Sequence, residues 1–237
     1  MQLIKPIIKT VTPNDSRIVN TLHTHHKIFG DLITDTRICN DGNNRLISEI
    51  KNKTGKRLGH EIFSIYNNQK TMLGYYIEVE PEYRKKGYHL GELMRLSSII
   101  TMLENNIKQL DILSKNTAIY FHSKYKFTPN VIVFEDRDNI LKTIIQNNKN
   151  PLDNIVKCAA EFIERLKHNP TAEEKRAITR ETNTLAKAYI DNVISQNTQK
   201  EHPFIGAMDM KLTTETVIEN KTFFNELFQK HGIDYKI

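Results

Sequence analysis

Hydrophobic and polar positions follow a strand-like period along the first eighty residues of the chain. Four runs are predicted as strands: Leu3–Thr10, Arg45–Lys51, Gly59–Tyr66 and Met72–Glu80. The polar breaks between the last three favour antiparallel hairpins. Between the first two runs, apolar positions recur at a spacing that predicts a helix ended by Gly30; they are Ile18, Val19, Leu22, His26 and Phe29.

Past Pro81 the pattern changes to helical spacing, with a helix predicted over Leu93–Leu103. A strand at Lys108–Leu113, a helix at Asn116–Tyr125 and a strand at Asn130–Glu135 are expected to follow. A crossover helix between two groups of strands predicts an α/β (α+β) fold. We therefore expect a mixed, mostly antiparallel sheet flanked by helices.

From Asp138 the chain becomes amphipathic with helical period, and a helical hairpin is predicted over residues 150–196. Phe204–Leu212 is expected to be a closing strand, and Thr214–Lys230 a last helix. We expect a core at 1–137, a helical hairpin insertion at 138–203 and a closing strand and helix at 204–237. The last helix carries an apolar stripe typical of a core or a homodimer seam, formed by Phe223, Phe224, Leu227 and Phe228.

The composition indicates a folded, unexported protein. Of 237 residues, 38% are hydrophobic and 26% charged, which is enough apolar material for a core. No run approaches the length of a membrane-spanning helix, and Met1–Lys9 has no following apolar signal region. Cys39 and Cys158 are far apart, which disfavours a disulfide framework or a cysteine zinc site. We expect a cytoplasmic protein with no membrane partner.

The formal net charge of +6 favours anionic partners without selecting among nucleic acid, acidic substrates and phosphate-bearing cofactors. The basic residues are spread along the chain, which disfavours nucleic acid. Their tightest group is Arg84, Lys85 and Lys86, in a glycine-containing segment that ends at Gly91. This segment joins a predicted strand to a predicted helix, so its backbone N–H groups suit a pyrophosphate. An ordinary basic surface turn is the alternative.

Two segments resemble the GNAT acetyltransferase superfamily. Val79–Met94 is similar to its acyl-coenzyme A signature, Arg/Gln-x-x-Gly-x-Gly/Ala. Asn116–Phe127 is similar to a second segment that usually holds Asn, Ala, Tyr and a closing Gly-Phe. The resemblance covers about residues 1–137, and it implies an N-acetyltransferase that uses acetyl-CoA as acyl donor. Nothing in the sequence fixes the acyl length, and the acceptor would be an amine on a small molecule or a protein.

The resemblance also implies where acetyl-CoA binds. Backbone groups of Tyr76–Val79 would meet the pantetheine arm, and amides of Lys85–Gly91 the pyrophosphate. His89 stands at the usual Gly/Ala position, where its side chain would crowd the turn and point toward the cofactor or the helix. The expected cofactor-binding residues are Ile77, Val79, Arg84, Lys85, Lys86, Gly87, His89, Leu90, Gly91 and Asn116.

Acyl transfer needs a deprotonated amine and a proton for the departing thiolate. A lysine-like amine, with a reference pKa near ~10.4, is protonated at neutral pH. Glu78 and Glu80 are candidate bases, with solvent-facing strand carboxylates as the alternative. His122 is at the position where the family usually has its tyrosine acid, and Tyr120 is a second candidate donor. His122 at a helix surface, and Tyr120 and Tyr125 as packing residues, remain open.

The sequence also allows other interpretations. His89, and the absence of the family's usual tyrosine at the position of His122, favour a degenerate member that binds the cofactor without catalysis. The net charge favours a basic nucleic-acid-binding or partner-docking module, whose binding would fall steeply with salt. His23, His25 and His26 lack a carboxylate or cysteine at ligand spacing, so no metal is predicted.

Overall fold

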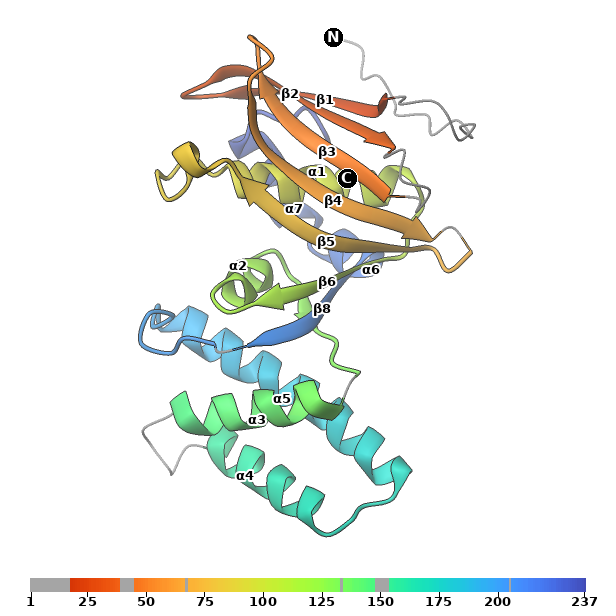
Figure 1. The fold of residues 1–237 in the computed structure, drawn as a ribbon, viewed down its shortest axis with the longest axis vertical. Helices are drawn as coiled ribbons and strands as arrows, with labels where there is room; N and C mark the ends of the chain where they lie inside the picture. Colours follow the sequence, from red (N-terminus) through yellow and green to blue (C-terminus); the bar gives the residue numbers. More distant parts are fainter. Residues whose placement is uncertain (1–17, 39–44, 67, 133, 148–153, 205) are drawn as a thin grey trace. The chain divides into compact units, whose positions relative to one another are not determined.

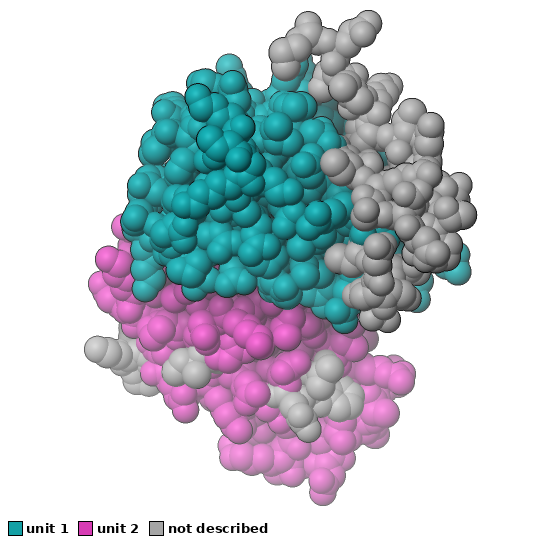
Figure 2. All heavy atoms as spheres, turned by 45° about the horizontal axis from the view of Figure 1, so that its top comes forward, with its two compact units in different colours: residues 1–111, 213–237 teal, residues 112–212 magenta. Residues whose placement is uncertain are grey.

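A computed structural model describes residues 18–38, 45–66, 68–132, 134–147, 154–204 and 206–237 of the chain. The predicted strand at Leu3–Thr10 lies outside these residues. The chain divides into two compact units, residues 1–111 with 213–237 and residues 112–212, coloured separately in Figure 2. Among the described residues, no helix combines the length and the apolar character that crossing a membrane requires.

The first unit is built on an antiparallel meander (Figure 1). Its strands are β1 (Ile18–His26), β2 (Gly30–Ile38), β3 (Arg45–Asn52), β4 (Arg57–Tyr66) and β5 (Thr71–Val79). Its helical elements are η1 (Pro81–Tyr83), α1 (Leu90–Glu104), α6 (Thr214–Glu219) and α7 (Lys221–Lys230). The alternating apolar positions of the strands form a core with α1 and α7, and that core includes Leu32, Ile50, Phe63, Leu96, Phe224 and Phe228.

The second unit holds α2 (Ala118–Lys124), β7 (Thr128–Pro129), α3 (Phe134–Asn147), α4 (Asn154–Lys167), α5 (Ala172–Ser195) and most of β8 (Ala207–Thr213). Strand β6 (Gln109–Lys115) leads from the first unit into the second. β7 pairs with β8 in antiparallel register, Thr128 opposite Lys211. A capping box formed by Thr171 and Glu174 precedes α5, which explains why that helix starts at Ala172.

The predicted class is confirmed as an α/β fold with a mostly antiparallel sheet flanked by helices. Strands β3, β4 and β5 and helix α1 lie within a few residues of their predicted places. Helices α4 and α5 occur where a helical hairpin is expected, and β8 follows them in the chain. The C-terminal helix is split at Asn220, which caps the end of α6 and the start of α7.

The helix predicted around residues 18–29 is wrong, because this segment forms β1 and the turn into β2. Its burial alternates with period two: Thr24 is buried, whereas His23 and His25 are exposed. Gly30 opens β2 at a φ of 69° instead of ending a helix. β-Branched residues at Ile18, Val19, Thr21 and Thr24 suit a strand, and pairing with β2 outweighs the apolar spacing that suggested a helix.

The strand predicted at Asn130–Glu135 is also wrong at every residue of that segment that the structure describes. The nearest strand, the two-residue β7, ends at Pro129, and Phe134 already begins α3. Val131 is held by the side chain of Asn183 on α5, which accepts from its N–H at 2.9 Å and donates to its carbonyl at 3.2 Å. A side chain far along the chain therefore takes the place of a strand partner.

Candidate functional site

The segment that joins β5 to α1 is a turn that contains residues with left-handed backbone conformation. Pro81 begins η1, and the chain then passes through Arg84 into α1 at Leu90. Lys85, Gly87 and His89 have φ values of 57°, 69° and 55°. For Lys85 and His89 the left-handed region costs roughly 1–2 kcal/mol each. Turns with left-handed residues at alternate positions fold their N–H groups around a concavity that suits an anion.

His89 is the N-cap residue of α1, and its side chain makes no capping hydrogen bond. Its Nδ1 lies 3.0 Å from Glu92 Oε2, so the imidazole points toward the helix. Glu92 also lies 3.0 Å from His231 Nε2 and 3.5 Å from Lys230 Nζ. The first-turn amides of α1 are thus left without a side-chain cap from His89, at the positive end of the helix dipole.

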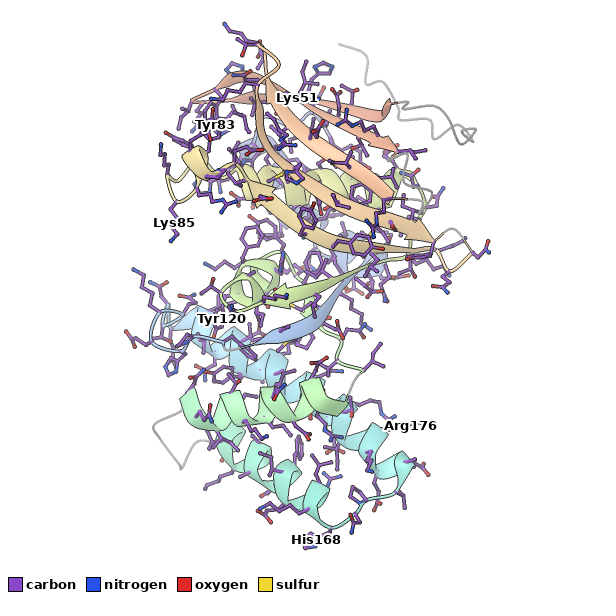
Figure 3. All side chains as sticks on the ribbon, viewed as in Figure 1. Lys51, Tyr83, Lys85, Tyr120, His168 and Arg176 are labelled. Atoms are coloured by element: carbon purple, nitrogen blue, oxygen red, sulfur yellow. The ribbon has the colours of Figure 1, made fainter. Side chains whose placement is uncertain are left out.

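The three basic residues of the turn are used differently. Arg84 folds back onto β5, where its Nε donates to the Val79 carbonyl at 2.7 Å and its Nη2 to Glu78 Oε1 at 2.5 Å. Lys85 and Lys86 are exposed and form no ion pair with any residue that the structure describes. Lys85 extends outward from the turn in Figure 3. The two lysines are therefore available to an anionic ligand, whereas Arg84 braces the strand.

Strand β5 is interrupted by a β-bulge. Ile62 faces Tyr76, but Phe63 faces Gly74, so Tyr75 is the extra residue. Tyr75 and Tyr76 are 40% and 48% exposed. Ser64 donates to the Tyr75 hydroxyl at 3.3 Å and lowers the pKa of that hydroxyl. Bulges of this kind leave backbone groups outside the ladder and are common beside active sites.

The candidate bases Glu78 and Glu80 lie on the same sheet face as Tyr76, and both are ion-paired. Glu78 pairs with Arg84, and the Glu78 side chain is 45% exposed. Glu80 is less accessible, at 22%, and accepts from Arg57 Nε at 2.6 Å. Arg57 also reaches Glu49; burial pulls the pKa of Glu49 upward, but Lys51, Arg37 and Arg57 together lower it. Glu80 therefore belongs to a larger cross-strand ion network.

His60 is a residue of this face that sequence reasoning missed. It lies opposite Glu78 on β4, and its Nε2 is 3.8 Å from Glu78 Oε2. Its ring meets the edge of Tyr76 at 5.5 Å between centroids. The His60 side chain is buried, and within the described residues its Nδ1 has no hydrogen-bond partner. The alternation of Gly59–Tyr66 already places His60 on the outward face, which was the available signal.

Three of the predicted residues, Tyr120, His122 and Asn116, lie in the second unit. The Tyr120 hydroxyl donates to the His202 carbonyl at 2.5 Å, and burial raises the pKa of this hydroxyl. His122 is buried on α2, with its Nδ1 2.8 Å from Ser114 Oγ and its ring against Phe127. Asn116, shortly before α2, is hydrogen-bonded to Gly206, shortly before β8. Its N–H donates to the Gly206 carbonyl, and its Oδ1 accepts from the Gly206 N–H.

The sheet residues Ile77 and Val79 face α1, so only their backbone is available from the outward side. Leu90 is 2% exposed and belongs to the core. Of the three histidines, His25 lies 2.8 Å from Asp31, whereas His26 turns toward Tyr88. No group of three His, Cys, Asp or Glu side chains placed to hold a metal ion occurs among the residues that the structure describes.

No family model matches the chain, and no curated protein matches it either. Solved structures do. Three of them are Gcn5 from Tetrahymena (21% identity, TM-score 0.35), a GNAT family acetyltransferase from Elizabethkingia anophelis with acetyl-CoA bound (16%, 0.34) and the PaiA N-acetyltransferase from Thermoplasma acidophilum in complex with coenzyme A (15%, 0.33). The matches cover 40%, 37% and 38% of this chain.

GNAT acetyltransferases are among the similar structures. The chain spans less than two thirds of each, namely 57%, 57% and 55% of the three. One of them, the Elizabethkingia anophelis protein, is described as a GNAT family acetyltransferase, the superfamily that the two sequence segments resemble.

Proposed function

We propose that this chain binds acetyl-CoA and transfers its acetyl group to an amine on a small molecule or a protein. The turn between β5 and α1 carries the proposal. It combines a signature-like sequence, left-handed backbone at Lys85, Gly87 and His89, and the positive end of a 15-residue helix. These features favour an anion with several oxygens, and the pyrophosphate of coenzyme A has that chemistry.

The proposed cofactor path follows the turn and β5. Backbone amides from Lys85 to Gly91 would hold the pyrophosphate, with Lys85 and Lys86 adding charge from the exposed side. Gly87 has φ +69° and nothing within 4 Å of the place a Cβ would take, so the turn is open there. The pantetheine arm would run along the backbone of Tyr76–Val79, beside the bulge that interrupts the ladder.

For catalysis, Glu78 is the better-supported base. It is more exposed than Glu80 and faces the bulge side of the sheet with His60 and Tyr76. The protonated amine would lose one proton to solvent, and the neutral amine would then form a bond to the thioester carbonyl carbon while the carbon–sulfur bond breaks. The second proton of the amine would pass to Glu78, directly or through water. On the resemblance alone, we propose His122 as the donor of the thiolate proton, with Tyr120 as the second choice.

A non-catalytic acyl-CoA-binding protein is the second candidate. Two observations favour it: the Tyr120 hydroxyl already donates to His202, and His122 is buried with one nitrogen beside Ser114. Such a protein would bind acetyl-CoA as tightly as an enzyme does. It would release no coenzyme A when offered a panel of amines, polyamines and lysine peptides.

Thermal unfolding with and without acetyl-CoA tests the cofactor site. A ligand at a hundred times its dissociation constant adds about 2.7 kcal/mol and raises the midpoint. Gly87→Glu should abolish the shift, because it places bulk and negative charge against the pyrophosphate. Gly55→Glu is the matched control: Gly55 has φ +81° and open space around its Cβ position, in the turn between β3 and β4.

Both variants strain a left-handed glycine and add one negative charge, so only the position of the charge differs. We expect Gly55→Glu to retain the shift. A parent protein that shows no shift at millimolar acetyl-CoA would rule out the proposed function. Equal loss in both variants would mean that the substitutions damage folding, and would count against the turn as the binding site.

A further inference from the structure

The hairpin of β1 and β2 contacts the turn that we assign to coenzyme A. His26, the last residue of β1, places its Nε2 2.8 Å from the Tyr88 carbonyl oxygen, in the middle of that turn. Its Nδ1 accepts the backbone N–H groups of Ile28 at 3.1 Å and Phe29 at 3.3 Å. Because Nδ1 accepts twice, the proton lies on Nε2, which donates to Tyr88. One imidazole therefore ties the hairpin turn to the cofactor turn.

Aromatic packing adds to this hydrogen bond. Phe29 meets the edges of Tyr83 at 5.4 Å and Tyr88 at 5.0 Å between ring centroids, and it lies 5.1 Å from the His26 ring. Tyr83 precedes Arg84, and Tyr88 follows Gly87. The hairpin thus contacts the turn on both sides of its basic residues. Figure 3 shows Tyr83 beside this end of the meander.

We propose that the β1–β2 hairpin is a built part of the coenzyme A site, with His26 as the residue that positions the pyrophosphate-binding turn. The inference rests on the proposed function for its ligand, but the contact itself does not. The turn holds Lys85 and His89 in left-handed backbone, a conformation that non-glycine residues leave readily when nothing restrains them. A turn that already has its binding conformation loses less conformational entropy when the cofactor binds.

Two substitutions of His26 separate its two hydrogen-bonding sides. His26→Asn retains an acceptor near the Nδ1 position for Ile28 and Phe29, but its side chain is too short to reach Tyr88. His26→Gln places an amide N–H near the Nε2 position and can still donate to Tyr88. His23→Asn is the matched control, since His23 is exposed on the same strand and faces away from the core.

Hydrogen exchange of the protein without cofactor gives the first measurement. Peptides covering residues 84–90 should exchange about fivefold faster in His26→Asn, the factor expected for loss of one hydrogen bond. Trypsin should cleave faster after Arg84, Lys85 and Lys86. His26→Gln and His23→Asn should match the parent, and peptides from β3 and β4 should be unchanged in all variants. Unchanged exchange in His26→Asn, or faster exchange in His26→Gln as well, would overturn the role of the Tyr88 bond.

Acetyl-CoA affinity gives the second measurement, by isothermal titration calorimetry. We expect a dissociation constant about fivefold higher for His26→Asn and unchanged for His23→Asn. A loosened turn with unaltered affinity would contradict the positioning role. Should the parent bind no acetyl-CoA, the proposed function fails, and the exchange result alone then decides whether the hairpin holds the turn.

Discussion

Replacing Glu61 with glutamine should remove a pH dependence of stability that the first unit owes to one buried ion pair. Glu61 on β4 is 0% exposed and Arg95 on α1 is 3% exposed, with Arg95 Nη1 2.9 Å from Glu61 Oε1. Arg95 also reaches Ser98 Oγ at 3.2 Å. The second carboxylate oxygen, Oε2, is buried with no hydrogen-bond partner among the described residues. Burial therefore removes the hydration of this carboxylate, and the contact with Arg95 compensates for only part of that loss.

The expected size follows from the pKa. Burial raises the pKa of Glu61 to about 7, against the opposing pull of Arg95. The ordinary value is 4.5, so the folded state holds this proton more tightly than the unfolded state. The stabilisation is complete below pH 4.5 and is lost as the pH rises through 7. At 1.36 kcal/mol per pH unit, the loss amounts to about 3 kcal/mol.

Glutamine offers Arg95 the same oxygen as a protonated carboxyl but cannot ionise. We expect Glu61→Gln and the parent to have similar free energies of unfolding near pH 5. At pH 8 the variant should be the more stable, by up to about 3 kcal/mol, because desolvation of a buried ion pair can exceed its attraction. Urea unfolding followed by circular dichroism at pH 5, 6, 7 and 8 measures the difference.

The difference between the two proteins isolates Glu61, because other titrating groups contribute equally to both. Glu82→Gln is the control, since Glu82 is an exposed carboxylate paired with Lys56 and should leave the pH profile unchanged. A parent that is more stable than Glu61→Gln at pH 8 would refute the reasoning. It would show that the attraction between Glu61 and Arg95 outweighs the cost of burying them.

Two further changes address the second unit. His122→Ala should lower turnover while leaving the dissociation constant for acetyl-CoA nearly unchanged, because a proton donor acts in the transition state. Unaltered turnover, measured where chemistry is rate-limiting, would show that His122 and its contact with Ser114 have only a structural role. Asn183→Ala should lower the free energy of unfolding by about 2 kcal/mol, because both hydrogen bonds to Val131 are lost. Thr184→Ala is the control, because Thr184 is the exposed neighbour of Asn183. An equal loss of stability in both variants would contradict the role of Asn183.

Elements whose signals are local were predictable from the sequence. Strands β3, β4 and β5 alternate apolar and polar residues between polar turns, and α1 has a helical apolar stripe after Pro81. Strand β1 was not, because its apolar residues satisfy helical spacing as well, and only pairing with β2 decides between them. The segment after β7 failed for a similar reason, since the group that holds Val131 lies on α5.

In the candidate site, too, the residues of a contiguous motif could be predicted from the sequence, whereas contacts between distant segments could not. Arg84 and Gly87 are identifiable because their motif is contiguous, but the partner of each charged group depends on strand register. Register sets His60 opposite Glu78 and brings Arg57 to Glu80, so two carboxylates that look equivalent in the sequence have different neighbours. Those neighbours leave Glu78 the more exposed of the pair.

Arg84 illustrates the consequence for cofactor binding. Its position in the motif suggests a phosphate ligand, yet its guanidinium already donates to the Val79 carbonyl and to Glu78. The charge of Arg84 is therefore balanced within the protein, and an incoming pyrophosphate would depend on backbone amides and on Lys85 and Lys86. Backbone amides bind only if the turn keeps its shape, so a site built this way needs an external brace. The bond from His26 to Tyr88 and the packing of Phe29 supply that brace from a part of the chain about sixty residues away.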